Sequence, residues 1–309
     1  MRVNSFRLES PKIVKPSKIL VMSDIHNNQE IFDDLLEIVG EQKPDYICLA
    51  GDTLDEADCD IAGLVDWLKK LAKKATVIIG LGNHELCWCD RPFRRPVPGE
   101  NQDFYSAIGK IKNCVLLKDE FSTYQPDDNL AFSALNMPIS WYSDRRENKA
   151  EFKKAVKRAG REAASGGAAN KLDKGRFNVL LSHSPNGWLF RGKLLARDEF
   201  RLMNRLDLIL SGHNHGGLVP GILRPVLRHY GFVGPSAKVV QPHAFGFWTD
   251  GKTSLILSDG VTKFAESSGF AAMGRLLNRV YIPDIESITL VPGEQYKLVK
   301  DRKPLKIFR

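Results

Sequence analysis

Two histidines stand two residues apart where an apolar run ends. The stretch 206–217 is apolar as far as Leu210, and His213 and His215 follow a Ser-Gly step and precede two glycines. If the backbone there is extended, side chains two apart point the same way, so both imidazoles can reach one small volume. A histidine after a strand is more often a hydrogen-bonded polar residue than a ligand, and this pair alone leaves both interpretations open.

Four further apolar runs end in the same way. Each predicts a buried strand, and each is followed by side chains that can bind a metal: Asp24 and His26, Asp52, Asn83 and His84, and His183. Loops at the carboxyl ends of strands in an open α/β sheet gather in one crevice. Carboxylate, imidazole and amide together suit two divalent ions of borderline hardness if Asp52 bridges them, whereas structural zinc needs four thiolate or imidazole ligands.

Helices are expected between these strands. Residues 31–39 place their apolar side chains on one face behind a cap at Asn27 or Asn28, and residues 60–74 repeat that pattern. The alternation predicts an α/β fold. Further expected elements are a helix at 103–112, strands at 115–117, 130–135, 254–258, 287–291 and 296–300, a surface loop at 86–99, short hairpins or irregular structure at 218–250, and a loop at 264–281.

A basic segment interrupts the alternation. Residues 145–176 contain eleven Lys and Arg against four acids, and 145–164 fit a helix with a weak apolar face. We expect a single domain over 1–309 with a basic helical insertion at about 141–176. The segment is either a solvated charged helix, the common fate of such runs, or a basic rim that attracts an anionic substrate, a lipid headgroup or nucleic acid.

Composition limits the cellular setting. The 309 residues are 43% hydrophobic with a net charge of +8, and no run approaches the ~18 apolar residues of a membrane helix. Five cysteines are an odd number without framework spacing, which favours a reducing compartment. Cys87 and Cys89 would be half of a zinc site, but no second pair completes it. We therefore expect a cytoplasmic protein, with peripheral contact to anionic membranes through 145–176 as an open hypothesis.

The ordered blocks resemble those of the calcineurin-like metallophosphoesterase superfamily. The family's blocks D-x-H, GD-x-x-D, GNH-[DE], a lone His and GH-x-H correspond in order to Asp24–His26, Gly51–Asp55, Gly82–Glu85, His183 and Gly212–His215. Each block is weak alone, but five in order, each after an apolar strand, make chance a remote explanation. A fainter similarity, in Gly216-Gly217 and in 258–286, is to the bacterial subgroup of small phosphodiesterases and UDP-diacylglucosamine pyrophosphatases.

The resemblance implies a fold, two metal ions and a role for each site residue. The family fold is a four-layer αββα sandwich of two mixed β-sheets flanked by helices. It implies two divalent metal ions, Mn, Fe or Zn before Mg, and a role for His84 in stabilising or protonating the leaving oxygen, with Asp55 orienting it. By the same resemblance the ligands of the first ion are Asp24, His26, Asp52 and His215, and those of the second are Asp52, Asn83, His183 and His213.

The function that follows is metal-dependent hydrolysis of a phosphodiester or pyrophosphate bond, in a small or lipid-linked substrate. Two cations would lower the pKa of a water between them from about 15.7 toward neutrality and so supply the attacking hydroxide. Glu56 stands where many family phosphatases carry a phosphate-binding arginine, which argues against protein serine/threonine phosphatase activity. A nuclease is the alternative enzyme, although no nucleic-acid module is recognisable. A noncatalytic scaffold is the alternative of another class, and the intact ligand set argues against it.

Overall fold

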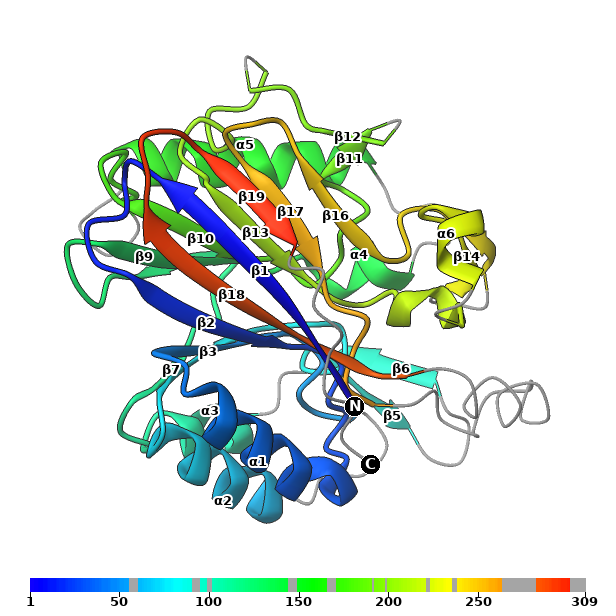
Figure 1. The fold of residues 1–309 in the computed structure, drawn as a ribbon. Helices are drawn as coiled ribbons and strands as arrows, with labels where there is room; N and C mark the ends of the chain where they lie inside the picture. Colours follow the sequence, from blue (N-terminus) through cyan, green and yellow to red (C-terminus); the bar gives the residue numbers. More distant parts are fainter. Residues whose placement is uncertain are drawn as a thin grey trace.

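The chain forms two facing β-sheets covered by helices (Figure 1). The computed structural model describes residues 1–55, 61–90, 95–98, 102–143, 149–165, 171–190, 192–197, 199–220, 223–234, 238–262 and 282–300. Glu56 and the predicted loop at 264–281 lie outside these residues.

The first sheet has seven strands in the order β19-β1-β18-β2-β3-β4-β7. Strands β2, β3 and β4 are parallel to one another and buried along nearly their whole length, because helices and the second sheet cover both faces, whereas β18 runs antiparallel to β2. The strands are β1 (Arg2–Ser10), β2 (Ser17–Met22), β3 (Tyr46–Ala50), β4 (Thr76–Gly80), β7 (Cys114–Leu116), β18 (Asp284–Pro292) and β19 (Lys297–Lys300).

The second sheet has six strands in the order β16-β17-β13-β10-β9-β8. Four parallel strands form its centre and an antiparallel strand lies at each edge. The strands are β8 (Phe121–Tyr124), β9 (Leu130–Leu135), β10 (Phe177–Leu181), β13 (Leu208–Ser211), β16 (Gly246–Thr249) and β17 (Ser254–Leu257).

Three buried clusters fill the spaces between four layers. Helices α1 (Phe32–Gln42), α2 (Ile61–Ala72) and α3 (Gln102–Ile108) pack on the first sheet, and α4 (Ile139–Ser143) and α5 (Lys149–Ser165) pack on the second. The middle cluster joins the sheets, with Val21 and Ile78 facing Phe132 and Val179. The predicted αββα sandwich of two mixed sheets is therefore confirmed.

Helix α5 covers the outer face of the second sheet. Its apolar residues Phe152, Val156, Ala159 and Ala163 are buried there, as the sequence predicted, while lysines line its exposed side. The single domain with an insertion at about 141–176 stays a prediction. No helix in the described part of the chain combines the length and apolar character that crossing a membrane requires.

Two segments differ from the predicted elements. Strand β1 was not predicted, because only three of its nine residues are large and apolar; it pairs with β18 along its whole length. The surface loop predicted at 86–99 is wrong in part, since β5 (Cys87–Asp90) and β6 (Arg95–Pro98) pair as antiparallel strands.

The hairpin predicted within 218–250 is present, as β14 (Gly231–Gly234) paired with β15 (Lys238–Gln241). The remaining short elements are η1 (Gln29–Ile31), capped by Asn28, the pair β11 (Leu189–Phe190) and β12 (Lys193–Leu194), η2 (His215–Leu218), and α6 (Arg224–Leu227).

Candidate metal centre

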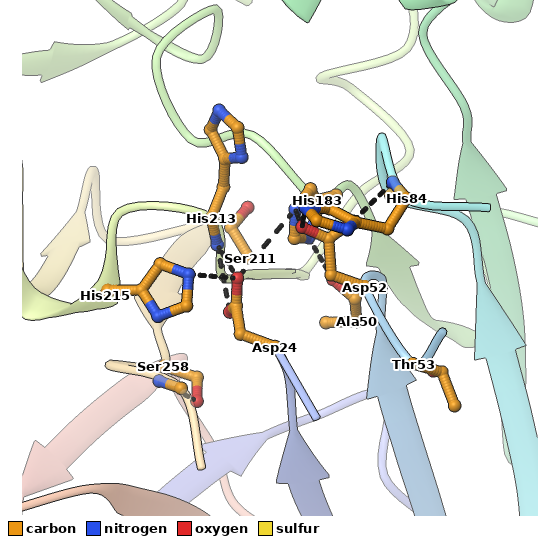
Figure 2. A network of polar contacts seen from close by, with 12 residues as sticks. Asp24, Ala50, Asp52, Thr53, His84, His183, Ser211, His213, His215 and Ser258 are labelled. Atoms are coloured by element: carbon orange, nitrogen blue, oxygen red, sulfur yellow. Dashed lines mark hydrogen bonds and ion pairs between the residues drawn. The ribbon is translucent and has the colours of Figure 1, made fainter. Parts of the chain in front are cut away.

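The predicted metal-binding side chains gather where five strands of the two sheets end (Figure 2). They come from the loops after β2, β3, β4, β10 and β13. Five of them have the left-handed backbone that non-glycine residues rarely adopt, with φ between 43° and 71°: Asp24, His26, Asp52, His213 and His215. Such conformations cost roughly 1–3 kcal/mol each and cluster at functional sites, where the surrounding structure holds them.

Backbone contacts fix these loops against one another. The amide of Asp24 donates to the carbonyl of Gly51 at 3.1 Å, and the amide of His26 donates to the carbonyl of Asp52 at 3.0 Å. Two glycines permit the approach: a Cβ at Gly82 would overlap Oδ1 of Asp52, and one at Gly212 would overlap the side chains of Ser23 and Asp24. The motif glycines are therefore explained by close packing around the two aspartates.

The first group of possible ligands contains Asp24, His26 and His215, whose ligand atoms all lie within 4.8 Å of one another. Oδ1 of Asp24 is 3.3 Å from Nε2 of His215, and the rings of His26 and His215 stack at 5.4 Å. Asp24 is fully buried, and both of its oxygens accept from the amide of His213. An ion at this place would meet one carboxylate and two imidazoles.

The second group contains Asp52, His183 and His213, all buried and again within 4.8 Å of one another. Nε2 of His183 lies 2.9 Å from Oδ2 of Asp52. Its Nδ1 donates to the carbonyl of Ala50 at 2.8 Å, which fixes the tautomer that leaves Nε2 available for a metal. Nε2 of His183 is also 3.9 Å from Oδ1 of Asp24, so the two groups adjoin (Figure 2).

A third group, His26, Asp55 and His84, lies at the rim. The side chain of His84 is 18% exposed; its Nδ1 is 3.7 Å from Asp55, and its Nε2 is 3.9 Å from Asp52. Its amide donates to Oδ1 of Asp52 at 2.9 Å, which holds the turn after β4 against that aspartate. Asn83 lies half-buried in the same turn. All nine predicted site residues thus lie on the neighbouring loops that follow these five strands.

The electrostatics of the centre favour metal-binding forms of the side chains. Burial and the nearby His84 lower the pKa of His26 to about 4, and burial and His183 lower the pKa of His213 to about 3. Burial alone would raise the pKa of Asp24 and Asp52, but the surrounding histidines outweigh it and hold both below the usual range. Ionised carboxylates and neutral imidazoles are the forms that bind divalent ions, so these residues fit the metals that the resemblance implies.

His183 is the exception among the imidazoles. Burial by itself disfavours its charged form, but the adjacent Asp52 outweighs burial and raises the pKa of His183 to about 9. A metal ion that binds Nε2 must therefore displace a proton there at neutral pH.

Glu85 has a role that the sequence did not predict. Its buried carboxylate accepts four backbone N–H groups from the loops after β3 and β4: Asp52 at 3.0 Å, Thr53 at 2.7 Å, Leu54 at 2.8 Å and Gly82 at 2.6 Å. Burial and Asp52 raise its pKa, while the amides of Leu54 and Gly82 act in the opposite direction. Glu85 joins the loop of Asp52 to the turn of His84, and its place in the GNH-[DE] block was the available signal.

Two other features were also missed. Tyr142 of α4 lies over the centre, with its ring 5.2 Å from that of His213 and 6.0 Å from that of His183. A second buried charge network lies beside the centre and contains Arg2, Arg224, Asp259 and Asp284. The network packs against the loop of His215. Arg224 and Asp259 approach Gly216 so closely that a Cβ added to this glycine would lie 2.9 Å from each of them.

Several known proteins are similar to this chain in sequence or in structure. An uncharacterized metallophosphoesterase of Campylobacter jejuni is 25% identical over 256 residues, which is 80% of this chain and 58% of that protein. Phosphodiesterase YaeI of Escherichia coli is 26% identical over 207 residues, 65% of this chain and 62% of that protein. The matches thus span less than two thirds of both relatives. Among solved structures, an archaeal phosphodiesterase aligns with 92% of this chain and 99% of its own at a TM-score of 0.41 and 12% identity.

A family model supplies the assignment. The model described as calcineurin-like phosphoesterase matches residues 17–217, the span that contains every predicted site residue. Phosphoesterases of this kind are hydrolases that use divalent metals, and the groups of possible ligands lie within the matched span. The chain belongs to the calcineurin-like phosphoesterase family.

Proposed function

We propose that the protein is a metal-dependent phosphoesterase that hydrolyses a phosphodiester or pyrophosphate bond in a small or lipid-linked substrate. The observation that carries the proposal is the pair of adjoining ligand groups, Asp24/His26/His215 and Asp52/His183/His213. Their division agrees with the two ion sites that the family resemblance implies. The similarity to a phosphodiesterase of Escherichia coli favours a diester over a monoester.

The two ligand groups and the family resemblance together support the proposed ion-binding roles. The first group would hold one ion and the second group the other, with Asp52 shared and Asn83 completing the second site. When bound, two divalent cations supply a more acidic water and neutralise the phosphoryl oxygens. Mn, Fe and Zn suit the mixed imidazole and carboxylate donors better than Mg, which prefers oxygen ligands alone.

His84 would assist departure of the leaving oxygen. Asp55 faces Nδ1 of the His84 ring, so Nε2 of His84 points toward Asp52 and the ligand groups. The side chain of His84 is partly exposed, which leaves room for a substrate beside it. A histidine at this position can donate a hydrogen bond or a proton to the departing oxygen. Asp55 acts through His84 and is therefore a positioning residue.

Replacing His84 tests this assignment. We expect His84→Ala to keep its metal content, measured by elemental analysis, and to lose about 10²- to 10⁴-fold in turnover. His229→Ala is the matched control. The ring of His229 lies outside the ligand groups, with its centroid 4.7 Å from that of Trp248, so this variant should leave metal content and turnover unchanged. Loss of metal from His84→Ala with full activity per remaining ion would refute the role.

The substrate class needs a hydrolysis panel of monoesters, diesters, nucleoside pyrophosphates and DNA, each with several metals. The nuclease alternative rests on the exposed lysines of α5 and predicts DNA cleavage that falls steeply with salt. The scaffold alternative predicts no turnover of any member of the panel. Cytoplasmic location and membrane contact through 145–176 stay predictions; vesicle sedimentation tests the second.

A further inference from the structure

Residues 223–240 carry a concentration of exposed apolar side chains. In the described part of the chain eight large hydrophobic residues are exposed, and five of them belong to this one segment. We name these five the apolar cap surface: Leu223, Val226, Tyr230, Phe232 and Val240. Contiguous exposed apolar surface is uncommon on soluble proteins and marks contact with a partner or a membrane.

Two local elements, the hairpin of β14 and β15 and the helix α6, carry these exposed side chains or directly adjoin them. In the hairpin of β14 and β15, the exposed Phe232 and Val240 lie between the pairs Gly231↔Gln241 and Val233↔Val239. Gly231 and Gln241, one residue along each strand, are buried.

The adjoining helix α6 divides its residues in the same way. Leu227 packs against the buried cluster of Val219, Ala244 and Phe245, whereas Val226 is 78% exposed. In Figure 1, α6 and β14 lie together at one side of the molecule, away from α5.

The apolar cap surface is attached to the metal centre. Gly231 of β14 packs against Gly217, two residues after His215, and a Cβ at either glycine would overlap the other. The side chain of Asn214 donates to the carbonyl of His243 at 2.9 Å, which ties the histidine loop to the segment after β15. Whatever binds the cap surface is therefore held beside the crevice.

Charge separates a membrane from a protein partner. No Asp or Glu occurs between Asp207 and Asp250, whereas Arg224, Arg228 and Lys238 fall within this stretch. Arg224 is neutralised by Asp259, but Arg228 is exposed. Apolar side chains with cations and without carboxylates suit the boundary between anionic headgroups and acyl chains, where a tyrosine also fits.

We propose that the apolar cap surface binds an anionic lipid membrane and holds the crevice of the metal centre at the bilayer surface. Helix α5 offers a weaker contact, because its apolar face is buried against the second sheet and only its charges face solvent. Stable peripheral binding needs an apolar and an electrostatic contribution together; the apolar cap surface supplies the first and the exposed Arg228 of the same segment supplies the second. The proposal goes beyond phosphoester hydrolysis and does not depend on it.

Vesicle sedimentation of the full chain tests the proposal. We expect binding to phosphatidylcholine vesicles that contain phosphatidylglycerol and little binding to phosphatidylcholine alone. The double variant Val226→Ser/Tyr230→Ser should lower the partition coefficient at least about tenfold, because it removes the apolar anchors. Arg228→Gln should lower it about fivefold, which corresponds to ~1 kcal/mol for one cation near the surface.

Val14→Ser is the matched control, because Val14 is 80% exposed in another part of the chain. It should bind as the wild type does, and unchanged thermal melting of each variant shows that the fold is intact. Absence of phosphatidylglycerol-dependent binding would overturn the proposal, as would an equal loss in Val14→Ser. Loss of binding in Lys154→Gln/Lys157→Gln, with the double variant unaffected, would assign the contact to α5 instead. A dimer that the double variant converts to a monomer in light scattering would make the surface an interface between copies.

Discussion

Two pairs of buried aspartates lie side by side in this protein and are neutralised in different ways. Asp24 and Asp52 belong to the candidate metal centre, and Asp259 and Asp284 belong to the neighbouring charge network. All four are at most 2% exposed. Carboxylates buried this deeply need partners, because an isolated buried charge costs far more than a fold can offset.

The network obtains its positive charge from the chain itself. Arg2 contacts Asp284 at 2.6 Å, Arg224 contacts Asp259, and Asn4 donates to Asp284 at 2.8 Å. A guanidinium is charged at every pH that the protein meets, so this arrangement is permanent and structural.

In the described part of the chain no arginine or lysine pairs with Asp24 or Asp52, and their ion-pair partners are histidines. His26 and His213 have pKa values of about 4 and 3 and are neutral at pH 7. The positive charge beside the two carboxylates comes from His183, whose pKa is raised to about 9 by Asp52, and a metal ion can displace that proton. The comparison shows that fixed guanidinium cations compensate the second pair of aspartates, whereas the first pair is surrounded by histidines, as the proposed binding of exchangeable metal ions requires.

Removing the shared carboxylate should have the largest effect. If Asp52 is shared by the two ions as proposed, Asp52→Asn removes an anionic donor from both sites, so we expect both ions to be lost together and turnover to fall roughly a thousandfold or more. Elemental analysis and initial rates measure both. Asp207→Asn is the matched control: Asp207 is buried beside Lys12 just before β13, at the end of that strand opposite His213. Full metal occupancy in Asp52→Asn would contradict the shared role.

Glu85 connects the two ligand-bearing loops, and its amide analogue should loosen them. In Glu85→Gln one oxygen becomes an NH₂ that faces backbone donors, so two of four charge-assisted hydrogen bonds are lost. We expect about 3 kcal/mol less free energy of unfolding and weaker metal binding. Urea unfolding and metal titration measure these. Unchanged metal affinity would show that the loops hold their places without Glu85.

Arg2 lies on the structural side of the comparison. Arg2→Met should lower the free energy of unfolding by about 2 kcal/mol, because Asp284 loses its shortest ion pair while Asn4 and Arg224 remain near it. Metal content per folded chain should not change. A variant of full stability that binds less metal would mean that the network serves the metal centre instead of the fold.

The sequence foretold the metal centre more fully than it foretold this network. The metal-binding residues follow apolar runs at fixed spacings, so strand ends alone bring them together. The network joins Arg2 and Asp284, which are 282 positions apart, through a strand that was not predicted. β1 carries a buried Asn4 on its inner face, and that polar residue is satisfied only by partners on β18. Local sequence patterns cannot predict a pairing between strands that lie so far apart in the chain.

The last expected effect depends on pH and concerns the proton balance of Asp259. Burial and the adjacent Asp284 raise its pKa to about 7, from 3.8 for an ordinary aspartate, although Arg224 acts in the opposite direction. Between pH 4 and 7 the folded chain therefore holds a proton that the unfolded chain has lost, and stability falls as pH rises through this window, by up to about 1.4 kcal/mol per pH unit. Asparagine resembles the protonated form and cannot ionise.

We therefore expect Asp259→Asn to gain stability relative to the wild type between pH 5 and pH 7, in urea unfolding of the metal-free chains. The opposite slope, with the wild type gaining on the variant, would mean that Arg224 keeps Asp259 ionised. Both pairs of aspartates would then be fully charged, and only the source of the compensating cation, guanidinium or metal ion, would distinguish them.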